Sequence, residues 1–299
     1  MSPAADRTAG RWLPAAAWAL VVAGLLEAEP ASRSRPASRP ADPPLARQKD
    51  ICFGAGTSPA VKTFRRAGIV LWTDAPGDGK GLLGHLEAVE RHLRSVLPTT
   101  RPASRPVALA VYARRGDYLD LWRRVGAHYH GRFGRIETDG YSYRVFCATS
   151  YDTPKRFQPR RSVLCHEFTH VWLYQRLGLR NDGNWLTEGI ANAVQLHFFP
   201  EAGDRRDFAR WLDTGRMLPL KRLMDQPRIE PKDYWQAATL VELLARRHRR
   251  RLPEVVAAFN RRRSAYRIVT EVLQTDFASL GRQWADDVHA AAAAAPRRR

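Results

Sequence analysis

The stretch LCHEFTH, residues 164–170, places two histidines four positions apart, with a glutamate directly after the first. In an α-helix, side chains at positions i and i+4 lie on one face about 5–6 Å apart, so His166 and His170 can reach a single ion. Glu167 is rotated about 100° from His166, off the ligand position but close enough to reach a metal-bound water. The motif therefore predicts a helical metal site with Glu167 beside it.

The residues around the motif favour the helix that it requires. Residues 162–177 have helical character, and Gly178 is a natural C-terminal cap. A second helix is predicted over NWLTEGIANAVQLHF, residues 184–198. Catalytic zinc takes three protein ligands and keeps a fourth position for water. Glu188 lies eighteen positions after His170, which leaves room for a helix end, a loop and the start of the next helix.

The two motifs together resemble those of the gluzincin zinc metallopeptidases, in which H-E-x-x-H is followed by a distal Glu in a W-x-x-E-G-x-A-like context. That context is matched at Trp185, Glu188, Gly189 and Ala191. The resemblance implies Zn²⁺ as the cofactor, with His166, His170 and Glu188 as its ligands. Over about residues 60–285 the chain is similar to the peptidase-MA-like families of exported bacterial proteins.

Of two other ligand sets, the sequence excludes the first and leaves the second as a competitor. The metzincin pattern would need Gly at position 173 and His at position 176, where this chain has Leu173 and Arg176. Asp182 is a competing third ligand, twelve positions after His170, but it lies in RNDGN, which is typical of a solvated turn. The remaining alternative is that His166 and His170 are ordinary surface or core histidines.

The remainder of the chain predicts an α+β fold. Strands are expected where β-branched and aromatic residues concentrate, over 67–74, 107–113 and 141–150. Helices are expected over 81–97 and over 117–126, which ends at Gly126. This order predicts an N-terminal mixed sheet-and-helix lobe over 51–160 and a mainly helical lobe with the zinc site over 161–290. The resemblance implies a zincin-like fold with the metal site between the lobes.

Catalytic roles follow from the resemblance and from helix positions. Glu167 would act as general acid and base on the zinc-bound water. Tyr234 is the candidate donor to the oxyanion, because DYWQ (233–236) is typical of a capping box with Asp233 as N-cap and Gln236 three residues on. A tyrosine packed beside Trp235 is the alternative.

Supporting positions are predicted around Glu188. Asn192, one helical turn later, is placed to accept the remaining N–H of a ligand imidazole, where thermolysin-like relatives carry Asp. It is otherwise a polar position on the helix surface. Thr187 is a candidate cap for the second helix, Gly189 lets another backbone come close, and Trp185 is expected to pack the loop against the first helix.

The N-terminus has the pattern of a targeting segment. Arg7 and Arg11 precede an apolar run over 12–26, which indicates a signal peptide or membrane anchor over residues 1–28 and a protein exported to the periplasm, cell envelope or exterior. An anchor that is not cleaved would hold the protein at the membrane surface. Residues 29–50 are rich in Pro, Ser, Ala and Arg and predict a disordered linker, and residues 291–299 form a basic tail.

Composition narrows the classes of molecule that this protein is expected to bind. The net charge is +19, supplied almost entirely by Arg, and no zinc-finger, RNP or basic-zipper pattern accompanies it. A solvated face or attraction to an envelope surface is favoured over specific binding of nucleic acid. The chain has three cysteines, Cys52, Cys147 and Cys165. In an exported protein two of them could form one disulfide, and the alternative is that all three are small buried side chains.

The function favoured by the sequence is zinc-dependent hydrolysis of peptide bonds by a monomer, with a peptide or protein as substrate. The G-x-M-E-N motif with which aminopeptidase relatives grip a free N-terminus is absent, which favours an endopeptidase. The resemblance to zincins implies that the expected strand over 141–150 lies beside the metal helix and pairs with an extended peptide. The alternatives are an inactive zincin-like binding module of the envelope and a basic nucleic-acid-binding protein.

Overall fold

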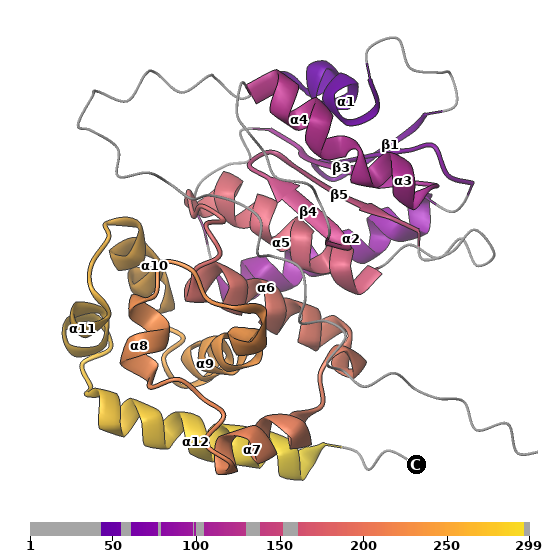
Figure 1. Cartoon of the computed structure of the whole chain (residues 1–299). Coiled ribbons are helices and arrows are strands. Elements are labelled where there is room, and N and C mark those ends of the chain that lie inside the picture. Colours follow the sequence, from indigo (N-terminus) through magenta and orange to yellow (C-terminus); the bar gives the residue numbers. More distant parts are fainter. Residues whose placement is uncertain are drawn as a thin grey trace, which may run out of the picture.

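The computed structural model describes residues 43–54, 61–76, 79–97, 99, 105–129, 138–151 and 161–295. A sheet covered by helices forms one lobe, and a group of helices forms the other (Figure 1). This arrangement confirms the α+β class and the order of the two lobes. The predicted targeting segment (1–28) and the last four residues of the basic tail lie outside the described residues.

The first lobe is built on a five-stranded mixed sheet in the order β1-β2-β3-β5-β4. The three inner strands are parallel, and each edge strand is antiparallel to its neighbour. The strands are β1 (Lys62–Arg66), β2 (Ile69–Thr73), β3 (Val107–Tyr112), β4 (Gly140–Tyr143) and β5 (Phe146–Ser150). Every residue of β2, β3 and β5 is buried, as expected for strands covered on both faces.

Alternate side chains of the inner strands enter two separate cores. One core joins Leu71 and Leu109 to α2 (Gly79–Val96) and α5 (Arg161–Leu177). The other joins Trp72 and Ala110 to α1 (Leu45–Phe53), α3 (Arg115–Leu119) and α4 (Leu121–Tyr129). Because α5 lies on the sheet, the sheet positions the helix that carries the histidine motif.

Several local predictions for this lobe are wrong. The linker over 29–50 is helical from Leu45 onward, because Gln48 and Ile51 are buried against the sheet and Tyr112 donates a hydrogen bond to the carbonyl of Cys52. Residues 141–150 form the hairpin β4–β5, with Arg144 in its turn at φ 43°. The helix over 117–126 is two helices, α3 and α4, and it does not end at Gly126.

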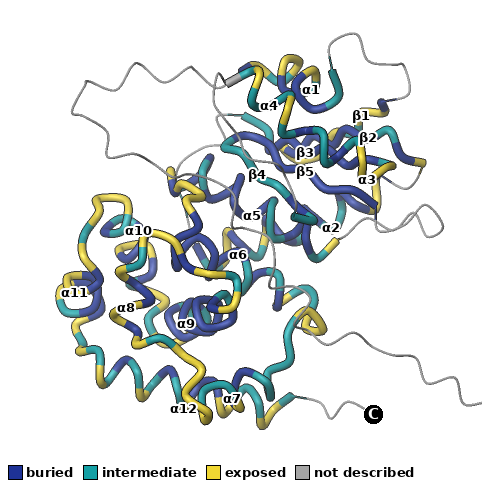
Figure 2. The backbone as a smooth tube through the Cα atoms, in the orientation of Figure 1, coloured by how far each residue is buried: buried dark blue, intermediate teal, exposed yellow. Residues whose placement is uncertain are grey.

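The second lobe consists of helices packed around α9 (Tyr234–Arg247), which contacts both α6 (Trp185–Phe198) and α12 (Phe277–Ala294). Figure 2 shows α9 as one of the most deeply buried segments. Because α12 ends at Ala294, the basic tail begins later than position 291. The remaining helices are η2 (Pro200–Ala202), α7 (Arg205–Asp213), α8 (Leu220–Asp225), η3 (Pro231–Asp233), α10 (Leu252–Asn260), α11 (Ala265–Arg267) and η4 (Ile268–Val272).

The close contact between α6 and α9 depends on Gly189. A Cβ at this position would lie 2.6 Å from the carbonyl oxygen of Ala237 and 2.9 Å from Cγ2 of Val241. We expect Gly189→Ala to lower the free energy of unfolding by about 1–3 kcal/mol, the usual cost of overpacking. Gly281 in α12 is the matched control, because a Cβ there would meet nothing within 4 Å. Gly281→Ala should be neutral or stabilising by up to about 1 kcal/mol in the same denaturant titration. Equal losses in the two variants would contradict this account of Gly189.

All three cysteines are free and buried, so the disulfide that the sequence permitted does not form. Burial raises the pKa of the Cys165 thiol to about 12, and this thiol therefore stays protonated beside His166. Among the described helices, none is both long and apolar enough to cross a membrane.

Candidate metal centre

Two consecutive helices carry the candidate ligands. α5 runs over Arg161–Leu177, as the sequence predicts to within one residue, and it ends at Gly178 with φ 70°. α6 begins at Trp185, and its N-cap is Asn184, whose side chain accepts hydrogen bonds from the backbone N–H groups of Leu186 and Thr187. The prediction that Thr187 caps the second helix is wrong, because Thr187 lies inside the first turn of α6. Asn184 has the extended backbone that an N-cap requires.

The side chains of His166, His170 and Glu188 meet at one point. The Nε2 atoms of the two imidazoles are 3.0 Å apart. Oε2 of Glu188 lies 3.3 Å from Nε2 of His166 and 3.5 Å from Nε2 of His170. The side chain of His166 is 13% exposed and those of His170 and Glu188 are nearly fully buried, so the cluster opens to solvent on the side of His166.

The spacing of these atoms suits a tetrahedral ion. Ligand atoms about 2.0–2.2 Å from such an ion lie about 3.3–3.6 Å from one another. The three measured separations, 3.0, 3.3 and 3.5 Å, are close to this range. Among the described residues, this is the one group of three or more His, Cys, Asp or Glu side chains close enough to hold a metal ion. Asp182, the competing ligand, is not part of it.

The electrostatics of the cluster favour a negative carboxylate beside the two rings. Burial alone would raise the pKa of Glu188, but the charge of His170 and the close contacts with both imidazoles hold it well below its usual range. Burial alone would lower the pKa of His166, but the Glu188 carboxylate raises it overall. A cation at this point would replace the imidazole protons as the partner of the buried carboxylate.

Glu167 lies beside the cluster, on the side of the sheet edge. It is half-buried, and its side chain packs against Gly140 in β4. A Cβ at position 140 would lie 2.4 Å from Cγ1 of Val163 and 2.8 Å from Oε1 of Glu167. The absent side chain of Gly140 therefore makes the space that holds the Glu167 carboxylate, and the edge strand and the glutamate are in direct contact.

Tyr234 faces the cluster, although not for the reason that the sequence suggested. Its ring stacks on the imidazole of His166, with centroids 6.4 Å apart and planes 12° from parallel. Burial and then the negative charge of Glu188 raise the pKa of the Tyr234 hydroxyl well above its usual range. The capping box is absent, because the Asp233 side chain caps no backbone N–H and the Gln236 amide is bonded to the backbone of Leu218.

Asn192 does not support an imidazole in the way that was predicted. Its side chain donates a hydrogen bond to the backbone carbonyl of Glu188, one turn earlier in the same helix. Gln195 is the candidate for that role instead, because its side chain is near enough to His166 to help raise the pKa of that ring. A signal for Gln195 was available, since Glu188, Asn192 and Gln195 follow the i, i+4, i+7 spacing of one helix face.

Removing the Gln195 amide should therefore weaken the metal site. We expect Gln195→Ala to lower zinc affinity by about 10–100-fold, the effect of losing a partner that orients a ligand imidazole. Asn192→Ala is the matched control from the same helix face and should change affinity by less than about threefold. Competition with a chelator of known affinity measures both variants. A greater loss in Asn192→Ala would contradict the assignment.

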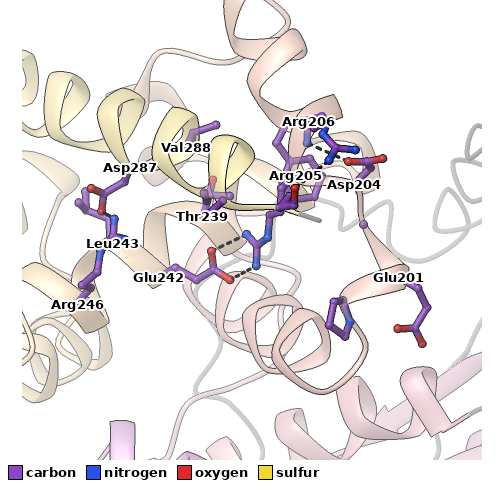
Figure 3. A pocket seen from close by; sticks show the side chains of 16 residues that line it. Glu201, Asp204, Arg205, Arg206, Thr239, Glu242, Leu243, Arg246, Asp287 and Val288 are labelled. Carbon is purple, nitrogen blue, oxygen red and sulfur yellow. Dashed lines mark hydrogen bonds and ion pairs between the residues drawn. The ribbon is translucent and has the colours of Figure 1, made fainter. Parts of the chain in front are cut away.

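A separate pocket lies in the helical lobe. It has a volume of about 640 Å³ and is lined by residues from η2, α7, α9 and α12. Figure 3 shows Arg205 and Glu242 in this pocket, joined by two ion-pair contacts of 2.6 Å. None of the three cluster residues lines it. The pocket is therefore distinct from the candidate metal centre.

The comparison with protein-family models found no matching family, and the comparison with curated proteins found no match either. The resemblance to gluzincins consequently stays an expectation from the two sequence motifs.

Proposed function

We propose that this protein is a zinc-dependent metallopeptidase with a zincin-like fold. The observation that carries the proposal is the meeting of His166, His170 and Glu188 at one point, with Glu167 adjacent in sequence to a candidate ligand. Their separations suit a tetrahedral ion, and two His with one carboxylate is a ligand set of catalytic zinc. The proposal includes export from the cytoplasm and a monomeric state, on the basis of the sequence.

A bound Zn²⁺ would lower the pKa of a water molecule towards about 7 and polarise a substrate carbonyl. Glu167 would accept the proton of the attacking water and deliver it to the leaving amine. The Tyr234 hydroxyl would donate a hydrogen bond to the developing oxyanion, because its ring lies beside the His166 imidazole. Gln195 would hold the His166 imidazole in its ligating orientation.

The edge of the sheet offers a place for an extended substrate. β4 is an edge strand, because among the described strands it pairs with β5 alone. It packs against α5 beside Glu167. A hydrogen bond of 3.0 Å from Asn181 to Ser142 fixes the α5–α6 loop to the same strand. A peptide added to β4 would bring its backbone past Glu167, which supports cleavage within a chain.

Hydrolysis of a casein-type substrate tests the proposal. We expect the wild-type protein to cleave it, to lose this activity on treatment with a chelator, and to recover it when Zn²⁺ is added back. Fragments identified by mass spectrometry should arise from internal bonds. A protein that holds zinc but cleaves nothing would instead be a zincin-like binding module.

A further inference from the structure

An arginine without a carboxylate partner lies beside the candidate centre. Arg228 belongs to the loop between α8 and α9, which ends at the helix that carries Tyr234. It is exposed, and within the described part of the chain no hydrogen bond or ion pair involves its guanidinium. The closest carboxylate along the chain, Glu230, pairs with Lys232 at 2.8 Å. Many other arginines in the structure, such as Arg205 and Arg176, are paired with carboxylates.

The position of Arg228 is set by contacts with the loop that joins the two metal helices. The backbone N–H of Ile229 donates to the carbonyl of Gly183 at 2.9 Å, and Ile229 itself is buried. The Arg228 side chain lies over Gly183, where a Cβ would come 2.9 Å from Cγ and 3.1 Å from Nε. Gly183 directly precedes Asn184, the cap of the helix that bears Glu188. The guanidinium is thus held over the loop between the candidate ligands.

Arg228, held over Gly183, is also near enough to Tyr234 for its charge to act on the tyrosine hydroxyl. Its positive charge lowers the pKa of the Tyr234 hydroxyl, against the larger effects of burial and Glu188. The Tyr234 ring stacks on His166, the most exposed of the three candidate ligands. Glu167 lies against Gly140 of β4. A substrate in the centre would therefore meet both the negative Glu167 side chain and the unpaired guanidinium of Arg228.

From this arrangement we propose that Arg228 binds a carboxylate of the substrate, next to the bond that is cleaved. The inference rests on the proposed function and gives it a substrate class, peptides with a carboxylate on the Tyr234 side of the centre. A guanidinium binds carboxylate through two parallel N–H donors, which a lysine cannot reproduce. The carboxylate can be an acidic side chain or the C-terminus of a peptide, since both present the same chemistry.

Binding to the zinc-loaded Glu167→Gln variant tests the inference without cleavage. Three labelled peptides of equal length serve as probes: one with acidic side chains and an amidated C-terminus, one neutral with a free C-terminus, and one neutral and amidated. We expect one of the first two to bind about 10–100-fold more tightly than the third, as charge-assisted hydrogen bonds typically contribute. The peptide that gains affinity identifies the source of the carboxylate.

Substitutions assign the gain to Arg228. In the Glu167→Gln variant, Arg228→Ala should abolish the gain in affinity for the carboxylate peptide, and Arg228→Lys should remove part of that gain. Arg216→Ala is the matched control, because Arg216 is also exposed and its loss lowers the net charge by the same one unit. It should preserve the gain. Thermal unfolding verifies that each variant is folded. If Arg228→Ala does not fold, Arg228→Lys alone tests the assignment.

The inference is overturned if neither carboxylate peptide binds more tightly than the neutral amide. It is also overturned if the gain survives Arg228→Ala, or survives Arg228→Lys undiminished, or is lost equally in Arg216→Ala. Hydrolysis of a casein-type substrate by the wild type distinguishes failure of this inference from failure of the proposed peptidase activity. Cleavage without a carboxylate gain removes the inference alone, and a gain that depends on Arg228 without any cleavage removes the proposed peptidase activity alone.

Discussion

Replacing Glu167 with Gln should lower peptide hydrolysis by about 10²–10⁴-fold while zinc remains bound. The amide has the shape of the carboxylate and fills the same space against Gly140, but it cannot accept the proton of the attacking water. Zinc should stay because Glu167 is not one of the three converging side chains. Steady-state cleavage of a casein-type substrate and zinc content, measured on the same preparation, give both quantities.

His166→Ala is the control for this prediction. It removes a candidate ligand and should therefore lose zinc and hydrolysis together. The contrast between the two variants distinguishes a proton-transfer residue from a ligand. Full activity in Glu167→Gln would show that Glu167 is not the general base.

The convergence of His166, His170 and Glu188 could be predicted because its geometry is mostly local. The i, i+4 spacing places His166 and His170 on one face of α5, and the two helix boundaries follow from Gly178 and from the residues that open α6. A short loop between consecutive helices then leaves Glu188 few places to lie. The carboxylate meets both imidazoles, as the spacing predicts.

The supporting contacts were harder to predict because they join distant segments. Gln236 caps nothing in its own helix and binds the backbone of Leu218, eighteen residues earlier. Gln195 contacts His166 only because α6 packs against α5. The spacing along α6 places both Asn192 and Gln195 on the face of Glu188, but no short-range pattern indicates which of the two finds the imidazole.

β1 and α1 were not predicted because their sequence patterns are weak. In β1, the sequence KTFRR is mostly exposed and lacks an apolar alternation. α1 begins within a segment rich in Pro, Ser and Arg, and it is held by packing against the sheet. The bounds of such elements depend on tertiary contacts, which composition does not reveal.

Glu188→Gln should weaken zinc binding by more than the roughly 10–100-fold expected for loss of an orienting partner, because it removes the anionic ligand itself. Asp182→Asn is the matched control. It makes the same chemical change in the loop before the helix, at an exposed residue outside the cluster. It should leave zinc affinity within about threefold of the wild type.

The zinc content of purified wild-type protein, Glu188→Gln and Asp182→Asn, determined by elemental analysis after dialysis, is the most direct measurement of the central claim. The account predicts about one zinc per chain in the wild type and in Asp182→Asn, and a marked loss in Glu188→Gln. A wild type that holds no zinc and takes up none at micromolar concentration would contradict it. So would loss of zinc from Asp182→Asn together with its retention in Glu188→Gln.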